Sequence, residues 1–304
     1  MAVQLFLRSL HDRNDWRGGL AKRTAAAGKY GIRCALHWPL QSSWLGFLYG
    51  TPAMTAMLAR DSRLLERPQH PYINRGLPQA RRYAIIESHY RHLFAHWPAR
   101  LVERIYAEDG ASLGRLALKN GSEVELRLTV PTGRSREGEL ALYLLNTQGE
   151  ALSSIIFTLA DDGRSLLLGC LQGAAAGLGR EAVREFTKQA YGLRPKNLLL
   201  SVLYALAAWS GVTRILGVSN DAHPFAGQAD KIKADYDSFW QECLGERTAD
   251  GFYALPPQEA PRDESLVESK HRSAFRRREA VRAQACDLLL NALREGSQPV
   301  SLAA

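Results

Sequence analysis

Four short apolar runs in close succession decide the fold: VELRLTV at 124–130, ELALYLLNT at 139–147, ALSSIIFTL at 151–159 and SLLLGC at 165–170. In the first run apolar and polar residues alternate, which is typical of a strand with one buried face. The connecting segments are short and carry the Gly and Asp residues of hairpin turns, the first turn being Pro131 to Gly138. Close spacing and short turns predict an antiparallel meander. Residues 113–118 could add an edge strand.

Outward from the meander, the pattern on both sides becomes helical. The C-terminal side should hold helices at 180–191, 195–209, 234–244 and 265–294, and short strands at 213–219 and 251–255. The 195–209 helix supplies a crossover between two strands of one sheet.

Before the meander, apolar residues at helical spacing and several prolines predict short helices. We therefore expect an α+β protein, with an antiparallel-rich mixed sheet flanked by helices and a helical N-terminal extension. We divide the chain into a basic, mostly helical region (1–100), an α/β core (101–262), and a basic C-terminal helix packed on the core with a short tail (263–304).

Composition places the chain among packed proteins of a reducing compartment. Of its 304 residues 46% are apolar and 23% charged, and its four cysteines form no CxxC pair. No signal peptide is visible, and the longest uncharged apolar stretch, Leu198–Trp209, is too short for a membrane-spanning helix. We expect a cytoplasmic protein with no transmembrane segment. Oligomeric state stays open.

Positive charge is concentrated near the N-terminus. Residues 1–100 hold 15 Lys and Arg against 5 Asp and Glu, whereas the whole chain carries +8. Such an excess suits a phosphate-bearing ligand, anionic lipid or nucleic acid. The alternative is a solvated basic face that serves solubility.

Two neighbouring segments suit an anionic ligand. The first is Gly192-Leu-Arg-Pro-Lys-Asn197, where Arg194 and Lys196 flank a helix start with free N–H groups. The second is the turn after the fourth run, with Gln172, Gly173, Gly177 and Gly179, where glycines permit close approach of the backbone. The alternatives are an ordinary charged helix start and an ordinary turn.

A polar cluster follows the predicted strand at 213–219. It contains Asn220, His223 and the segment Asp235-Tyr-Asp-Ser-Phe-Trp240. His223 suits an acid or base role, and Tyr236 suits protonation of a leaving thiolate. The alternatives are a hydrogen-bonded histidine and aromatic residues that only pack.

The basic C-terminal helix places Arg272 and Arg276 on one face, four residues apart. That face could clamp a phosphorylated ligand or contact nucleic acid, although a solvated helix explains it equally. His89, His92 and His96 have metal-compatible spacing but lack further ligands, so we predict no metal site. The motifs of P-loop NTPases, zincins and serine hydrolases are missing.

Several motifs in order resemble the VirK/YbjX family, a bacterial family described as a domain of unknown function. They are Leu171-Gln-Gly173, Thr187-Lys188, Gly192 to Lys196, Gly217 to Asn220 with His223, Asp235 to Asp237 with Phe239-Trp240, and Ser269 to Arg278. The resemblance spans residues 60–295. It implies an association with envelope integrity and virulence, and it names no reaction.

The order of elements also resembles the core of GNAT acyltransferases: meander, glycine turn, helix, strand ending in Asn, helix with Tyr. This resemblance implies that the turn and helix start hold the pyrophosphate of acyl-coenzyme A, with Asn220 and Tyr236 at the reaction centre. The expected turn is met only as Ala174-x-x-Gly177-x-Gly179, without its first residue. An extra helix, 180–191, leaves two candidate phosphate sites.

These observations favour an acyltransferase that takes an acyl or aminoacyl group from coenzyme A, a carrier protein or tRNA to an amine. His223, Asp235 or Asp237 would deprotonate the amine and Tyr236 would protonate the leaving group, with no cofactor required. The alternative is a non-catalytic protein that binds a polyanion or a protein partner through its basic surfaces.

Overall fold

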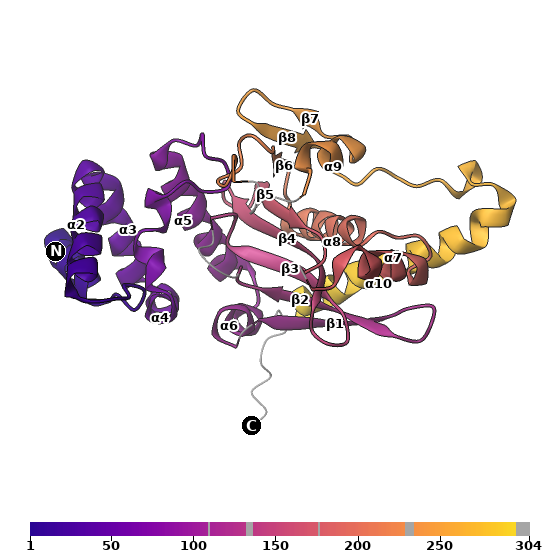
Figure 1. Ribbon diagram of the computed structural model, residues 1–304, viewed down its shortest axis with the longest axis horizontal. Coiled ribbons are helices and arrows are strands. Elements are labelled where there is room, and N and C mark those ends of the chain that lie inside the picture. The colour runs from indigo at the N-terminus through magenta and orange to yellow at the C-terminus, as the bar shows by residue number, and fades with distance from the viewer. Residues whose placement is uncertain (109, 132–135, 176, 229–233, 296–304) are drawn as a thin grey trace.

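The core of the molecule is one sheet with strand order β1-β2-β3-β4-β5-β6-β8-β7 (Figure 1). The computed structural model describes residues 1–108, 110–131, 136–175, 177–228 and 234–295. The strands are β1 (Ala111–Ala117), β2 (Glu123–Thr129), β3 (Leu140–Leu145), β4 (Ala151–Ala160), β5 (Ser165–Gln172), β6 (Arg214–Val218), β7 (Glu246–Arg247) and β8 (Phe252–Leu255).

The sheet is mixed and mostly antiparallel. β1 to β5 form an antiparallel meander, β6 joins β5 in parallel, and β8 pairs antiparallel with both β6 and β7. The predicted fold class is confirmed, and so is the edge strand, whereas β7 was not predicted. The predicted turn at 131–138 lies partly outside the described residues, as do Ala176 of the glycine turn and the tail at 296–304.

Burial along the strands shows where the core lies. β2 alternates between buried and partly exposed residues, so one of its faces looks toward solvent. In β4 every residue after Ala151 is buried, which requires cover on both faces. The helices α5 and α8 both pack against β4 and provide much of that cover.

Helices occur both before the first strand of this sheet and after β5. The N-terminal ones are α1 (Ala2–His11), α2 (Leu20–Leu36), α3 (Trp38–Gly50), α4 (Pro52–Arg60), α5 (Gln79–His96) and α6 (Ala99–Ala107), with 3₁₀ turns at Ser62–Leu65 and Arg67–Gln69. The later ones are α7 (Gly179–Gln189), α8 (Pro195–Ser210), α9 (Tyr236–Glu242) and α10 (Ser269–Glu295), with a 3₁₀ turn at Glu264–Leu266.

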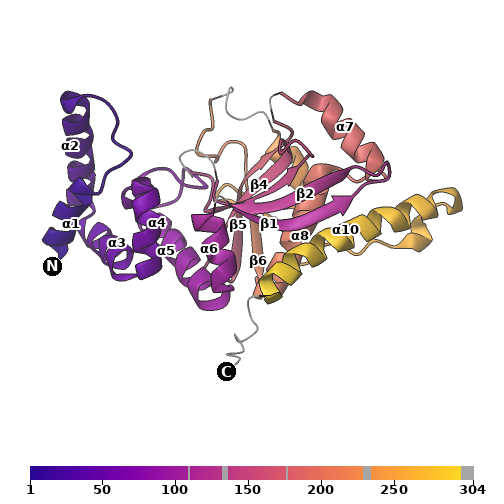
Figure 2. The same cartoon turned by 90° about the horizontal axis from the view of Figure 1, so that it is seen from below.

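The first four helices and the last one lie at opposite ends of the molecule (Figure 2). α1 to α4 lie at one end and α10 extends along the other, where it packs on α8 and β1 (Figure 2). Within the described part of the chain, no helix combines the length and apolar character that crossing a bilayer requires.

A buried ion pair ties the N-terminal region to the sheet. Arg67, from the second 3₁₀ turn, contacts the carboxylate of Glu139, whose side chain is fully buried. The hydroxyl of Tyr90 donates to the same carboxylate at 2.5 Å, and Asp61 accepts from Arg67 at 3.0 Å. Because an unpaired charge inside a protein is costly, this network fixes α5 and the loop before β3 relative to each other.

Candidate functional site

The candidate site lies where two parallel strands part. β5 pairs with β6 only from Ser165 to Leu168, and beyond that point β5 continues to Gln172 paired with β4 alone. A register shift at this position leaves Gly169 as an extra residue between Leu168 and Cys170. Openings of this kind at the carboxyl end of parallel strands are where α/β sheets bind ligands.

Four side chains meet at this opening: Glu137, Cys170, His223 and Tyr236. The Nε2 atom of His223 lies 3.1 Å from the Glu137 carboxylate. The hydroxyl of Tyr236 donates to the Cys170 sulfur at 3.4 Å, and the rings of His223 and Tyr236 lie 5.4 Å apart. His223 and Cys170 are fully buried and Tyr236 nearly so, whereas the Glu137 side chain is 17% exposed. Glu137 is therefore the most exposed member of this cluster.

Gly169 sets the position of Glu137. A Cβ atom at residue 169 would lie 1.8 Å from the carbonyl oxygen of Glu137, closer than any real contact. Only glycine lets the segment before β3 cross β5 at this distance. The bulge thus both opens the strands and admits the carboxylate.

The hydrogen bonds of His223 define its tautomer. Its Nδ1 atom accepts from the backbone N–H of Phe225 at 3.2 Å, so in the neutral ring Nε2 carries the proton; Nε2 lies 3.1 Å from a Glu137 carboxylate oxygen but is not aligned to form a hydrogen bond with it. His223 is thus a close neighbour of the Glu137 carboxylate, and Glu137, the more exposed of the two, is the better-placed base. His223 nevertheless lies beside Tyr236, the residue predicted to protonate the leaving group.

Three of these side chains are of the kinds that bind metal ions. The ligand atoms of Glu137, Cys170 and His223 lie within 4.8 Å of one another. However, Nε2 of the neutral His223 ring carries a proton and offers a cation no lone pair, because Nδ1 already accepts the Phe225 N–H. The arrangement fits a hydrogen-bonded acid–base cluster better than a metal centre.

Burial keeps the two weak acids of the cluster protonated. It raises the pKa of the Tyr236 hydroxyl far above its ordinary value, and the neighbouring Cys170 adds to the effect. Burial likewise raises the pKa of the Cys170 thiol, and Glu137 contributes, while hydrogen bonds with Tyr236 and Gln172 oppose the rise. At neutral pH Tyr236 therefore keeps its proton, and a neutral Cys170 is unsuited to act as a nucleophile.

Arg194 and Lys196 line a neighbouring pocket of about 350 Å³ at the start of α8. Gly173, Asp235 and Glu242 line it too, and Arg194 pairs with Glu242 at 2.6 Å. Burial lowers the pKa of the Lys196 ammonium, which lies 5.7 Å from the Phe239 ring. The two predicted cations do share one pocket, although two carboxylates balance their charge.

Asn220 connects β6 to α9. Its side chain donates to Asp235 at 2.9 Å and accepts from the backbone N–H of Tyr236 at 2.9 Å, and its own N–H donates to Asp237 at 2.8 Å. Asp235 also caps α9 by accepting from Ser238. Both aspartates are engaged in fixing α9, and through it Tyr236, so neither is placed as well as Glu137 to take a proton.

The structure places the predicted site residues at two separate places. Gln172, His223 and Tyr236 lie close to Cys170 or to one another, and Asn220 binds the backbone of Tyr236, but none of these four lines a described cavity; Arg194 lines the pocket at the start of α8. The remaining predicted ligand residues lie apart from both places. Gly177 and Gly179 are exposed at the start of α7, Arg276 pairs with Glu264, and Arg272 donates to the backbone of Val267.

A family model described as a protein of unknown function (DUF535) matches residues 20–285. The chain belongs to the VirK/YbjX family. Its relative YbjX of Escherichia coli K12, described as uncharacterized, is 30% identical over 257 residues, covering 82% of this chain and 78% of YbjX. An uncharacterized protein of Haemophilus influenzae is 29% identical over 161 residues, 52% of this chain and 54% of that protein. The VirK/YbjX resemblance seen in the motifs is confirmed.

Among solved structures, a cAMP-binding acyltransferase from Mycobacterium smegmatis, in mutant form, aligns with a TM-score of 0.34 at 11% identity. The alignment covers 73% of this chain and 63% of that one. Likeness at this level carries no argument about activity, so the chemistry of this VirK/YbjX chain has to be argued from its own residues.

Proposed function

We propose that this VirK/YbjX protein is an acyltransferase that moves an acyl or aminoacyl group from a phosphate-bearing donor to an amine. The observation that carries the proposal is the pairing of a base with an acid at the strand opening. The Glu137 carboxylate and the Tyr236 hydroxyl are connected through the Cys170 sulfur, which lies within 4.8 Å of one and 3.4 Å from the other.

The proposed reaction uses each member of the cluster once. Glu137, which lies beside His223, takes a proton from the acceptor amine, whose nitrogen attacks the acyl carbon. The bond from that carbon to the donor sulfur (or oxygen, for an aminoacyl ester) breaks, and Tyr236 gives its proton to the leaving atom. The Tyr236 hydroxyl already donates to a sulfur atom in the resting protein, so its orientation suits that step.

The donor would be held at the start of α8. The first-turn N–H groups there have no side-chain cap, and Arg194 and Lys196 stand beside them. A phosphate or pyrophosphate satisfies such donors. Coenzyme A, acyl carrier protein and aminoacyl-tRNA all carry a group of this kind, so they are the donors to test.

The test is a binding screen with coenzyme A, acetyl-coenzyme A, acyl carrier protein and aminoacyl-tRNA. A donor at 100 times its Kd should raise stability by about 2.7 kcal/mol. The variant Arg194→Gln/Lys196→Gln should lose this shift. A control variant with the same charge change, Lys119→Gln/Lys188→Gln, removes two exposed lysines outside the pocket and should keep it. If no donor shifts the transition, or both variants respond alike, the proposal fails.

A further inference from the structure

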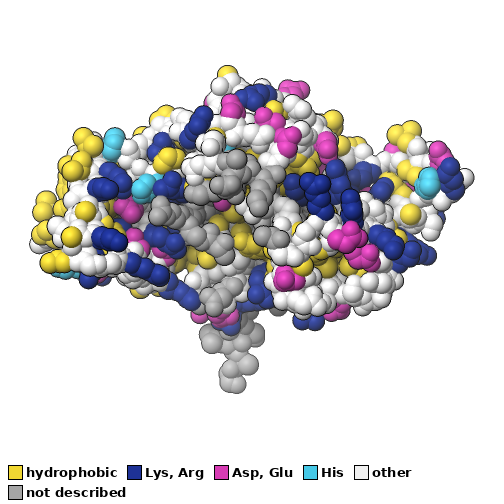
Figure 3. Space-filling view, in the orientation of Figure 1, with side chains coloured by type: hydrophobic (Ala, Val, Ile, Leu, Met, Phe, Trp, Pro, Cys, Tyr) yellow, Lys and Arg dark blue, Asp and Glu magenta, His cyan; other side chains and the backbone are white. Residues whose placement is uncertain are grey.

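The largest described cavity lies beside the candidate site, between the N-terminal helices and the loop before β3. Its volume is about 910 Å³. Lys and Arg side chains gather over this part of the surface (Figure 3). Six cationic side chains line the cavity against three carboxylates, an excess of three positive charges; the cations are Arg17, Lys29, Arg33, Arg60, Arg63 and Arg136.

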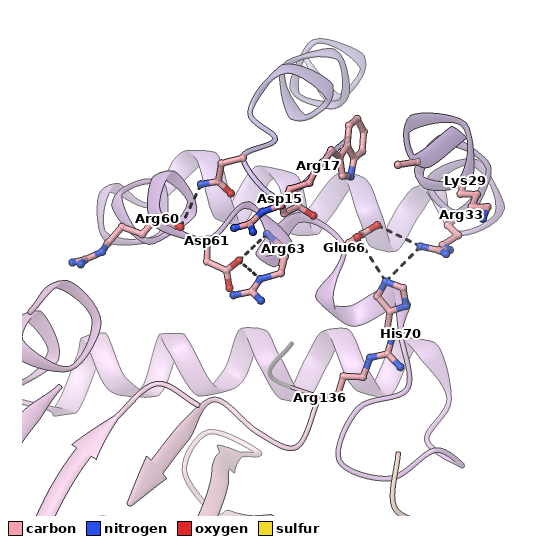
Figure 4. Close-up of a pocket in the computed structure, with 13 residues that line it drawn as sticks. Asp15, Arg17, Lys29, Arg33, Arg60, Asp61, Arg63, Glu66, His70 and Arg136 are labelled. Atoms are coloured by element: carbon pink, nitrogen blue, oxygen red, sulfur yellow. Dashed lines mark hydrogen bonds and ion pairs between the residues drawn. The ribbon is translucent and has the colours of Figure 1, made fainter. Parts of the chain in front are cut away.

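The three carboxylates are already engaged (Figure 4). Asp61 lies 2.6 Å from Arg63 and 3.0 Å from Arg67. Glu66 pairs with Arg33 at 3.4 Å and with the buried Arg13 at 3.1 Å. Asp15 pairs with the same Arg13 at 2.9 Å. Burial acts to raise the pKa of Asp61 and Glu66, but the neighbouring cations hold both below their ordinary values.

Two of the cations have no partner among the described residues. Arg17 comes from the loop between α1 and α2, and Lys29 comes from α2 itself. Both are exposed, and both line the cavity with the other cations (Figure 4). Positive charges gathered in a cavity attract a negatively charged ligand.

Below these side chains lies a buried guanidinium with unused donors. The Arg13 side chain is 1% exposed, and its Nε and Nη1 atoms have no hydrogen-bond partner. It lies 4.3 Å from the ring of Trp16, which lines the cavity, and 5.1 Å from the ring of Tyr30; Arg13 itself lines an adjoining pocket of about 440 Å³. Arg13 thus adds a buried positive charge behind the cavity wall, where it holds Asp15 and Glu66 in place.

The cavity and the reactive cluster share one segment of chain. Arg136 lines the cavity, and the next residue, Glu137, contacts His223. Arg136 also lies 5.9 Å from the ring of Phe225, which in turn lies 5.7 Å from the His223 ring. A ligand that contacts Arg136 is therefore held one residue along the chain from the proposed base.

We infer that this cavity binds the phosphate-bearing end of the acceptor and presents its amine to Glu137. Three excess charges and several guanidinium groups, which bind phosphate with two parallel hydrogen bonds, suit a diphosphate or a pair of monophosphates. Naming the ligand as the acceptor rests on the proposed function, whereas the binding of phosphate does not.

The test is titration calorimetry with inorganic pyrophosphate at low salt. It is run in an Arg194→Gln/Lys196→Gln background, so that the donor pocket does not contribute. Adding Arg17→Gln/Lys29→Gln should weaken binding roughly tenfold or more, because each lost contact is a charged hydrogen bond. Adding Lys119→Gln/Lys188→Gln, which makes the same charge change elsewhere, should leave the affinity within about twofold. A second arm, sedimentation with phosphatidylcholine vesicles with or without phosphatidic acid, distinguishes lipid-borne from soluble phosphate.

Failure to bind either phosphate source, or equal weakening in both variants, would overturn the inference. Pyrophosphate binding that depends on Arg17 and Lys29, in a protein that transfers no acyl group, would keep the phosphate site and remove its assignment to an acceptor.

Discussion

Replacing Gly169 with alanine tests how the bulge positions the proposed base. The added Cβ atom would lie 1.8 Å from the carbonyl oxygen of Glu137, and side-chain contacts need at least 3.0 Å, so the Glu137 backbone must move by at least 1.2 Å. Such a movement is enough to break the 3.1 Å contact between Glu137 and His223. Overpacking of this kind costs about 1–3 kcal/mol of stability. A catalytic group misplaced by about 1 Å can lose roughly 10²-fold in rate.

The assay combines thermal unfolding with release of coenzyme A from an acyl donor in the presence of an amine. Gly169→Ala should lower the Tm by a few degrees and lower the rate far more than stability alone explains. Gly46→Ala is the matched control, because residue 46 is helical and nothing lies within 4 Å of an added Cβ there. Wild-type Tm and rate in Gly169→Ala would show that Gly169 does not set the position of Glu137.

Three further substitutions probe the surrounding structure. Arg67→Met should cost about 3–5 kcal/mol in urea unfolding, because it leaves the fully buried Glu139 carboxylate without its ion pair; a cost below about 1 kcal/mol would contradict this. Burial lowers the pKa of His89 to about 3, so the unfolded chain binds a proton at a higher pH than the folded chain does, and stability falls as the pH drops from about 6.5 toward 3. His89→Gln should reduce the slope of stability against pH in that range by up to about 1.4 kcal/mol per pH unit. An unchanged slope would refute the lowered pKa of His89. Tyr236→Phe removes only a hydroxyl whose partner is the weak acceptor Cys170, so the Tm should stay within a few degrees while coenzyme A release falls at least tenfold; equal rates would exclude Tyr236 as the acid.

The elements of this fold follow closely from local pattern. The alternation at 124–130 predicted β2 within one residue at each end, and α8 ends at Ser210, one residue beyond the predicted range, where Gly211 stops it in the left-handed conformation. β7 escaped prediction because two exposed residues carry no periodicity. α10 begins at Ser269, four residues later than expected, because a 3₁₀ turn precedes it.

The candidate site was predictable only in part. His223 and Tyr236 stood out because they follow a strand and open a helix, and both lie in the cluster. Glu137 carried no signal, because it lies in a turn and reaches the site only through the bulge at Gly169. Arg272 and Arg276 contact Val267 and Glu264 instead of the site. Their helical spacing shows that they share a face, but it does not show what that face contacts.

The measurement that tests the account most directly is the rate of coenzyme A release by wild type and Glu137→Gln, with donor affinity measured in parallel. Glutamine keeps the shape of the side chain, but it cannot take a proton. The account predicts acyl transfer by the wild type, a loss of roughly 10²-fold or more in Glu137→Gln, and an unchanged donor Kd. Equal rates in the two proteins, or a wild type that binds the donor and transfers nothing, would contradict it.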